Sequence, residues 1–380
     1  MERMTTSENT IVLNDLDKPA FLSINRGYSF FGKIIHDASI DELLLQAEKD
    51  NDLINRFIAF YKIVDMEKMK QINEPGTLPS TEFTDLYNDL VQDAELMNEA
   101  GAQFMTIFES VEDEKLSHRY QLLYDIKQKL QNTVARRHTS SLISLYGNYA
   151  EKVNTGNDYI TGEVNAIKNR QVKNQCLSLL STLDTPAVHD LIRQQFETAR
   201  NATDKLSAIS LYLESSAPDK IQVMQDFQKQ SEKHPVSWET FLRVIGSISS
   251  DDVFDLVRQV GQSDAFRIEQ ANDQRALYGS FAYNRKKSLE TEEGVNCLSI
   301  ILRLATINEY NTVGILNVLA NIDRMEEKHH VPLVEMMAGF LEKLDQESSP
   351  SVYNRIRKIL LNTPVAVGKY EKINGKINLV

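Results

Sequence analysis

The sequence predicts a mainly α-helical fold, an irregular α-solenoid in which antiparallel helix pairs stack as they do in armadillo and HEAT arrays. Two observations predict it: apolar residues recur at helical spacing through most of the chain, and helix starts follow one another at intervals of about 15 to 20 residues. Helix pairs of this length bury their apolar faces against neighbouring pairs. The sequence has no strict repeat, so we expect an irregular array.

Helical periodicity is clearest between Leu116 and Leu130. The apolar residues of this segment follow one another at intervals of three or four positions, which places them on one helix face. They are Leu116, Tyr120, Leu123, Ile126 and Leu130. Similar patterns predict helices over residues 40–48, 51–71, 82–98, 139–150, 161–183, 186–199, 203–215, 218–230, 237–247, 251–260, 273–283, 294–306, 313–322, 331–345 and 351–362.

The segments between the predicted helices carry residues that begin helices. Ser, Thr and Asp side chains accept hydrogen bonds from the free N–H groups of a first helical turn, and Pro fits its first position. Such residues stand at 184–186, 216–218, 249–251 and 348–350. They support a division of the chain into many short helices.

The two ends of the chain differ from its helical middle. Residues 10–14 and 29–35 resemble short strands, and the tail carries Asn374-Gly375, a preferred pair for a two-residue β-hairpin turn. Because lone strands are marginally stable in water, we expect these to pair with one another, to pack on the first helices or to bind a partner. The predicted division is a short β segment (1–36), a helical solenoid domain (37–363) and a C-terminal tail with a hairpin (364–380).

Composition limits the expected partners. The chain has 42 Lys and Arg against 54 Asp and Glu, a formal net charge of −12, which repels nucleic-acid phosphates and acidic lipid surfaces. Residues 1–10 lack the apolar core of a secretory signal, and no long apolar run follows. We therefore expect neither nucleic acid nor a membrane as a partner.

The two cysteines indicate a reducing compartment. Cys176 and Cys297 are far apart in the sequence, and each stands among apolar residues of a predicted helix. Such thiols are ordinarily buried and inert. We expect a cytoplasmic protein without disulfides.

The sequence carries no recognisable catalytic or metal-binding motif. The zinc motif H-E-x-x-H, which places two histidines one helical turn apart with a glutamate base between them, does not occur. The nucleophile motif G-x-S-x-G and Gly-rich phosphate loops are also missing. The pair His329-His330 would point in two directions, so we expect a solvated helix end there. We predict no catalytic residue, no metal ligand and no cofactor in this chain.

Six short segments together carry a family resemblance. They are Lys18-Pro19 through Arg26-Gly27-Tyr28-Ser29 to Lys33-Ile34, Asp52 with Asn55-Arg56, 172–180 (V-K-N-Q-C-L-S-L-L), 201–208 (N-A-T-D-K-L-S-A), Trp238 and 272–281 (N-D-Q-R-A-L-Y-G-S-F). In order and spacing they are similar to the C-terminal helical region of the bacterial aminopeptidase N family of zinc metallopeptidases. The resemblance runs from Lys18 to Leu361 and does not include a catalytic domain.

The resemblance implies a non-catalytic role. In the family, this helical region forms a bowl that caps a zinc-containing catalytic domain and gates peptide access, so the zinc would belong to that missing domain. The implied partner is the catalytic half of an aminopeptidase, or another protein or peptide. The alternative is a stand-alone solenoid scaffold that binds other proteins, since solenoids offer long concave surfaces.

The resemblance also implies candidate site residues. Arg275 and Asn272 lie in the N-x-x-R part of the last motif, where the arginine could bind a peptide carboxylate or form a structural salt bridge. Trp238 is a candidate interaction residue, with a helix-pair core position as the alternative. Several positions depart from the family pattern. Asp273 and Gly314 stand for arginines, Glu290 stands for a histidine and Cys297 stands for a tyrosine, which puts peptide handling in question.

Overall fold

The computed structural model describes residues 7–8, 10, 12, 17–32, 34–151 and 159–378. Every regular element in these ranges is helical, which confirms the mainly α prediction. The first elements are η1 (Arg26–Tyr28), α1 (Ile40–Lys49), α2 (Leu53–Asn73), α3 (Thr81–Gln92), α4 (Ala94–Ala100), η2 (Ala102–Met105), α5 (Tyr120–Arg137), α6 (Thr139–Glu151) and α7 (Tyr159–Ser181).

The remaining helices continue the array to the C-terminal end. The central ones are α8 (Pro186–Thr198), α9 (Ala202–Glu214), α10 (Lys220–Ser231), α11 (Pro235–Gly246), α12 (Asp252–Gly261), α13 (Ala271–Gln274), the π-helical η3 (Arg275–Gly279), α14 (Ser280–Tyr283) and α15 (Arg285–Ser288). The last ones are α16 (Glu292–Ile301), η4 (Leu302–Thr306), α17 (Glu309–Leu316), η5 (Asn317–Leu319), η6 (Ile322–Arg324), η7 (Glu327–His329), α18 (His330–Leu341), α19 (Pro350–Leu361) and α20 (Pro364–Asn374).

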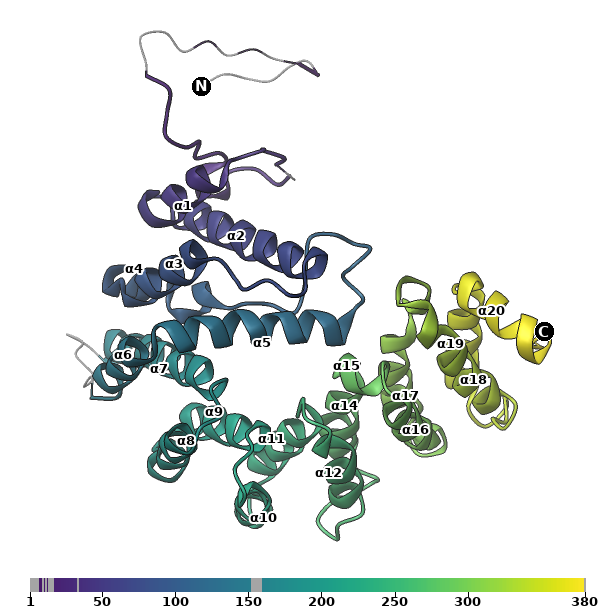
Figure 1. The fold of residues 1–380 in the computed structure, drawn as a ribbon. Coiled ribbons are helices and arrows are strands. Elements are labelled where there is room, and N and C mark those ends of the chain that lie inside the picture. Colours follow the sequence, from purple (N-terminus) through teal and green to yellow (C-terminus); the bar gives the residue numbers. More distant parts are fainter. Residues whose placement is uncertain are drawn as a thin grey trace.

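The helices follow an arc with two rows. Figure 1 shows α8, α10, α12, α16 and α18 along the outer side and α9, α11, α14, α17 and α19 along the inner side, while α5 lies across the inner side of the arc. Successive helices pack on one another, α8 on α9 and α10 on α11. The apolar residues that they bury form one continuous core.

Local sequence signals set where many helices begin. At α1, Ser39 accepts a hydrogen bond from the Glu42 amide (3.2 Å) and the Glu42 carboxylate accepts one from the Ser39 amide (2.9 Å), a reciprocal cap. The predicted starts at Pro186 and Pro350 are confirmed, because these prolines occupy the first positions of α8 and α19.

Motifs that are separate in the sequence contact one another in the fold. Asp52 accepts a hydrogen bond from the Gly27 amide (2.6 Å), which joins the first two similar segments. Asp204 forms an ion pair with Lys173 (2.5 Å) and accepts a hydrogen bond from Asn174 (3.0 Å), which joins the third segment to the fourth. These motif residues therefore hold neighbouring helices together.

The N-terminal end of α5 is fixed by residues far along the chain. The Glu290 carboxylate accepts hydrogen bonds from the amides of Tyr120 (2.9 Å) and Gln121 (2.7 Å), so it caps α5 from the segment after α15. Lys286 of α15 lies 3.3 Å from Glu109, which stands in the loop before α5. These contacts join α5 to the middle of the arc.

The predicted terminal strands are wrong where the structure describes them. Residues 29–32 and 34–35 form no strand, and the positive φ angles at Asn25, Gly27 and Tyr28 form a tight turn directly before them. No second strand is described that could pair with this segment, and a lone strand is marginally stable. The predicted strand at 10–14 lies mostly outside the described residues.

The predicted C-terminal hairpin is replaced by a helix. Pro364 begins α20, and Gly375, with φ of 87°, ends it after Asn374. A glycine with positive φ is a common helix terminator, so Asn374-Gly375 acts here as a stop signal and not as a hairpin turn. The helix is stabilised by packing on α18.

Buried side chains include both cysteines and both adjacent histidines. The expected burial of Cys176 and Cys297 is confirmed, and burial raises the pKa of Cys176 to about 12. His329 and His330 do lie at a helix start, but they are only 8% and 2% exposed, so the expected solvation is wrong. The reason is that α18, which His330 begins, packs against α16 and α20.

Candidate functional site

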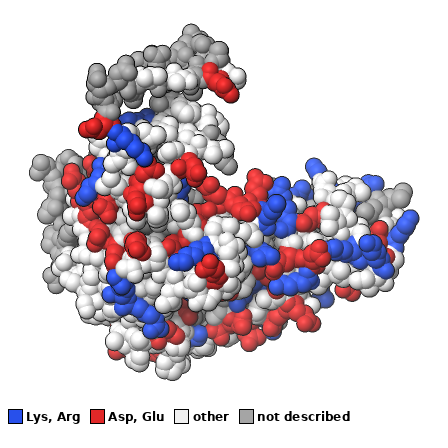
Figure 2. Space-filling model, turned by 45° about the horizontal axis from the view of Figure 1, so that its top comes forward, with Lys and Arg blue, Asp and Glu red and all other residues white. Residues whose placement is uncertain are grey.

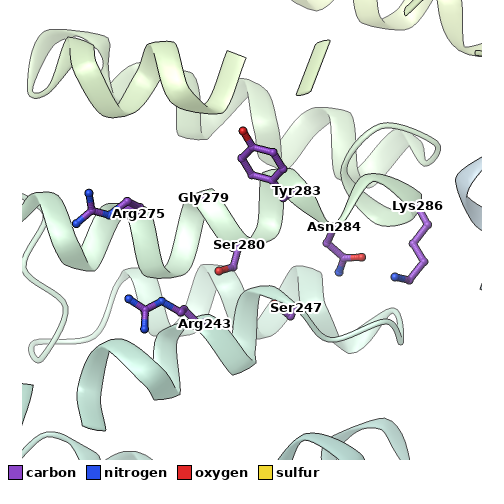
Figure 3. Close-up of a pocket in the computed structure, with 8 residues that line it drawn as sticks. All are labelled: Arg243, Ser247, Arg275, Gly279, Ser280, Tyr283, Asn284 and Lys286. Carbon is purple, nitrogen blue, oxygen red and sulfur yellow. The ribbon is translucent and has the colours of Figure 1, made fainter. Parts of the chain in front are cut away.

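A groove of about 480 Å³ lies between α11 and the helices η3, α14 and α15 (Figure 3). Its lining carries three cationic side chains and no acidic one. The lining residues are Arg243, Ser247, Arg275, Gly279, Ser280, Tyr283, Asn284 and Lys286. Figure 3 shows the two guanidinium groups at one end of the groove and Lys286 at the other.

The arginine end of the groove is organised by a short hydrogen-bond chain. Arg275 donates a hydrogen bond to the side-chain oxygen of Asn272, and Asn272 donates to Glu239 (2.9 Å). Glu239 also lies 3.4 Å from Arg243, one turn along α11. Among the described residues Arg275 forms no ion pair, so its charge is balanced by no carboxylate. The candidate residues Arg275 and Asn272 are thus in direct contact.

The backbone of Arg275 is positioned by a π-helical turn. Residues 273–283, predicted as one α-helix, form α13, the π-helical η3 and α14 in succession. Opposite this turn, a Cβ atom on Gly246 would lie 2.5 Å from the carbonyl oxygen of Leu277 and 2.8 Å from the amide nitrogen of Phe281. Only glycine therefore allows α11 to approach η3 this closely. Single π-turns inside helices are frequent at functional sites.

Trp238 lies beneath the groove and does not line it. Its side chain is 3% exposed and stacks on Phe241 with ring centroids 5.4 Å apart. Its indole nitrogen donates a hydrogen bond to Asp273 (3.2 Å), which is fully buried and also accepts from the Arg267 amide (3.2 Å). This position is that of a helix-pair core residue, and Asp273 serves as its buried hydrogen-bond acceptor.

The opposite end of the groove is joined to α5 by charged and aromatic contacts. The Glu109 carboxylate lies 3.3 Å from Lys286 and 3.0 Å from Lys127. The Lys286 ammonium also lies 4.6 Å from the ring centroid of Tyr124, within the range of a cation–π contact. The two lysines hold the pKa of Glu109 below its usual value against the opposing effect of burial.

The surface charge makes the cationic groove distinctive. Figure 2 shows acidic side chains scattered over the face in view, with groups of Lys and Arg between them. This distribution agrees with the net charge of −12. A groove lined by three cations and no acid is therefore a local exception on an acidic protein.

Sequence reasoning singled out Arg275, which lines the groove, but not Arg243 or Lys286, which line it as well. Arg243 follows Glu239 by four positions on a predicted helix, a spacing that ordinarily indicates a surface ion pair. Lys286 belongs to a short basic run with no motif character. Only the packing of α11 against η3 and α14, with α15 following α14, brings these residues to one groove, and no local pattern predicts that contact.

Among the side chains that the structure describes, no group of three or more His, Cys, Asp and Glu is arranged to hold a metal ion. The described ranges also contain no helix that is both long and apolar enough to cross a bilayer.

A family model covers most of the helical array. The model, described as the domain of unknown function DUF3458_C with ARM repeats, matches residues 40–361. The chain belongs to this family. The recognition of a C-terminal helical domain of the aminopeptidase N family is thereby confirmed.

Relatives and a solved structure agree with this assignment. Aminopeptidase N of Escherichia coli strain K12 is 23% identical over 62% of this chain and 27% of the relative. Aminopeptidase N of Haemophilus influenzae is 22% identical over 50% of this chain and 22% of the relative. The chain thus spans about a quarter of the length of these relatives. A crystal structure of Legionella pneumophila aminopeptidase A in complex with aspartic acid has a similar fold, with a TM-score of 0.76 and 18% identity over 88% of this chain and 40% of that one.

The positions that depart from the family pattern have structural roles or none in this chain. Glu290 caps α5, and Asp273 is hydrogen-bonded to Trp238. Cys297 is buried beside an apolar cavity, while nothing lies within 4 Å of a Cβ atom placed on Gly314. The arginines of the groove are thus Arg243 and Arg275.

Proposed function

We propose that this chain covers the active site of an aminopeptidase N-like catalytic domain and limits entry to short peptides, without catalysing a reaction itself. In this proposal the zinc ion and the catalytic residues belong to the catalytic domain, which is the partner of the chain. The support is membership in the C-terminal ARM-repeat family and the arc-shaped arrangement of the helices.

We further propose that the groove binds the C-terminal carboxylate of a peptide through Arg275 and Arg243, with Asn272 holding Arg275 in place. The observation that carries this is the bonding of Arg275, whose guanidinium hydrogen-bonds, among the described residues, to the neutral side chain of Asn272 alone, in a groove with no acidic lining residue. A planar guanidinium binds a carboxylate through two parallel hydrogen bonds. The second arginine at the same end of the groove adds charge and donors.

Calorimetric titration of the chain with tetra-alanine tests the carboxylate site. Tetra-alanine with a free carboxylate should bind, and its C-terminal amide should bind at least about tenfold more weakly. Arg275→Gln should remove this difference. Arg200→Gln is the matched control, because Arg200 is an exposed arginine outside the groove. Equal binding of acid and amide by the unmodified chain would overturn the carboxylate site.

Capture from native extract tests the covering role. Tagged chain should recover an aminopeptidase activity on alanyl or leucyl chromogenic amides that a chelator abolishes, while the purified chain with added zinc should show none. Turnover by the purified chain that survives contamination controls would contradict the non-catalytic assignment.

A stand-alone interaction scaffold is the second candidate. The observation that favours it is the loss of family arginines at Asp273 and Gly314, together with the structural use of Glu290. Under this candidate, capture recovers partners that lack peptidase activity. Recovery of a peptidase as the main partner counts against it.

A further inference from the structure

A second cavity, of about 310 Å³, lies between α5, α7, α9 and the segment after α11. Its lining is almost entirely polar, with Leu211 as the single aliphatic residue. Purely polar cavities hold either ordered water or a polar ligand. The side chains of α5 decide between these two occupants.

Two glutamines of α5 line this cavity without hydrogen-bond partners. Gln131 is 5% exposed, and no other described residue bonds to its amide; the Gln128 amide is half-buried and equally unpaired. Residues three positions apart lie on one face of a helix, so both amides face the same space. Neither amide is among the buried polar atoms that lack a partner, so the amide atoms open onto the cavity. A primary amide both donates and accepts hydrogen bonds. Such groups match the N–H and C=O of a peptide main chain.

The charge of the second cavity is opposite to that of the arginine groove. Glu109, Asp184 and Glu214 line it together with one cation, Lys127. Glu109 is paired with Lys127 and Lys286, and Asp184 is bonded to His189. Glu214, in contrast, accepts from the amides of Ser249 and Ser250 and forms no ion pair among the described residues. A carboxylate without a cation, as at Glu214, favours a positively charged group such as a peptide N-terminal ammonium.

The two cavities adjoin. Lys286 lines the arginine groove and Glu109 lines the polar cavity, and their charged groups are 3.3 Å apart. Ser247 and Ser249, two positions apart, line one cavity each. Lys286 stands at the end of the groove opposite the arginines (Figure 3), so the polar cavity continues the groove away from the carboxylate end.

We propose that the groove and the polar cavity together form one site for a short zwitterionic peptide bound in a fixed direction. Its carboxylate meets Arg243 and Arg275, its main chain passes the Lys286–Glu109 pair, and its N-terminal part is held by Gln131 and Gln128. The carboxylate end of this site rests on the proposed function, whereas the glutamine end is argued independently from the cavity and its unpaired amides.

Calorimetry with capped peptides and α5 variants tests the glutamine end. The probe is an alanine octapeptide, because four residues span at most about 14 Å and would not reach from Arg275 past Lys286 to α5. The N-acetylated octapeptide should bind at least about fivefold more weakly than the free octapeptide, because it lacks the ammonium. Gln131→Leu and Gln128→Leu should each weaken octapeptide binding about five- to tenfold. The matched control is Gln121→Leu, since Gln121 lies on the same helix outside the cavity and bonds to Asp125.

The outcomes separate this inference from the carboxylate site. One outcome is binding that depends on the free carboxylate but is unchanged by acetylation, by Gln131→Leu and by Gln128→Leu. This outcome would overturn the directional site and leave the carboxylate site intact. The cavity would then hold only solvent. Loss of binding on acetylation, with an equal effect in the Gln121→Leu control, would also overturn it, because the glutamines would then have no specific role.

Discussion

At the scale of single residues, Lys68 of α2 is the most unusual charged group in the described part of the chain. Its side chain is 1% exposed, and its ammonium donates hydrogen bonds to the carbonyl oxygens of Phe108 and Ser110, both at 2.7 Å. Burial lowers the pKa of Lys68 to about 8, with Asp65 opposing the shift. Lys68 thereby anchors the loop that carries Glu109 to the site.

Lys68 predicts a pH dependence of stability. Between pH 8 and 10.5 the unfolded chain keeps the Lys68 proton while the folded chain loses it, so the free energy of unfolding rises with pH, by on the order of 3 kcal/mol over this window. Urea unfolding at several pH values should show this rise in the unmodified protein and not in Lys68→Met. Lys70→Met on the same helix is the control. Parallel pH profiles for all three proteins would show that Lys68 is not the cause.

Asp204 predicts a large loss of stability on substitution. It is 4% exposed and joins Lys173, Asn174 and the cap residue Asn201. Asp204→Ala leaves Lys173, whose side chain is 12% exposed, without its partner, which should lower the free energy of unfolding by about 3 kcal/mol. Asp190→Ala, at an exposed position on α8, should change it by less than about 0.5 kcal/mol. Similar denaturation midpoints for both variants would refute the joining role of Asp204.

At the scale of elements, the crossing of α11 and η3 depends on one glycine. Gly246→Ala places a Cβ atom against the η3 backbone and should lower the free energy of unfolding by about 2 kcal/mol while weakening tetra-alanine binding. Gly314→Ala is the contrast, because this helical glycine has open space around it and alanine should stabilise by about 0.5 to 1 kcal/mol. Thermal unfolding measures both. If Gly246→Ala left the free energy of unfolding unchanged, α11 and η3 would not be packed as closely as the structure shows.

The cap on α5 predicts a local change in hydrogen exchange. Glu290→Ala removes the acceptor for the amides of Tyr120 and Gln121 and should speed exchange in the first turn of α5 by about tenfold. Exchange in the last turn of α5 should stay unchanged. Glu292→Ala, an exposed neighbour, is the control. Equal protection of these amides in both variants would show that Glu290 does not stabilise the first turn of α5.

Periodicity and caps predicted the helices well because both signals are local. Segments such as 186–199 and 351–362 repeat apolar residues on one face and begin with Pro or a capping residue, so their helices are fixed by near neighbours. The strand at 29–35 and the hairpin at Asn374-Gly375 failed because a strand needs a partner and the glycine pair also suits a helix end. The π-turn at Arg275 and the cap by Glu290 depend on contacts far apart in sequence, which no local pattern contains.

At the scale of the whole molecule, the site is a product of the array and not of any single helix. Helix α5 packs on α2, α3 and α7 and also reaches α15, so it lies opposite the inner row of the arc (Figure 1). The arginine groove belongs to the inner row and the glutamines belong to α5. A peptide held by both would lie between the two walls.

A crystal structure of the chain with an alanine octapeptide, which is long enough to reach both ends of the site, tests this account most directly. The account predicts one peptide whose carboxylate lies within hydrogen-bonding distance of Arg243 and Arg275 and whose main chain contacts Gln131. A peptide bound on the outer helices, or an empty groove at concentrations that saturate binding in solution, would contradict it.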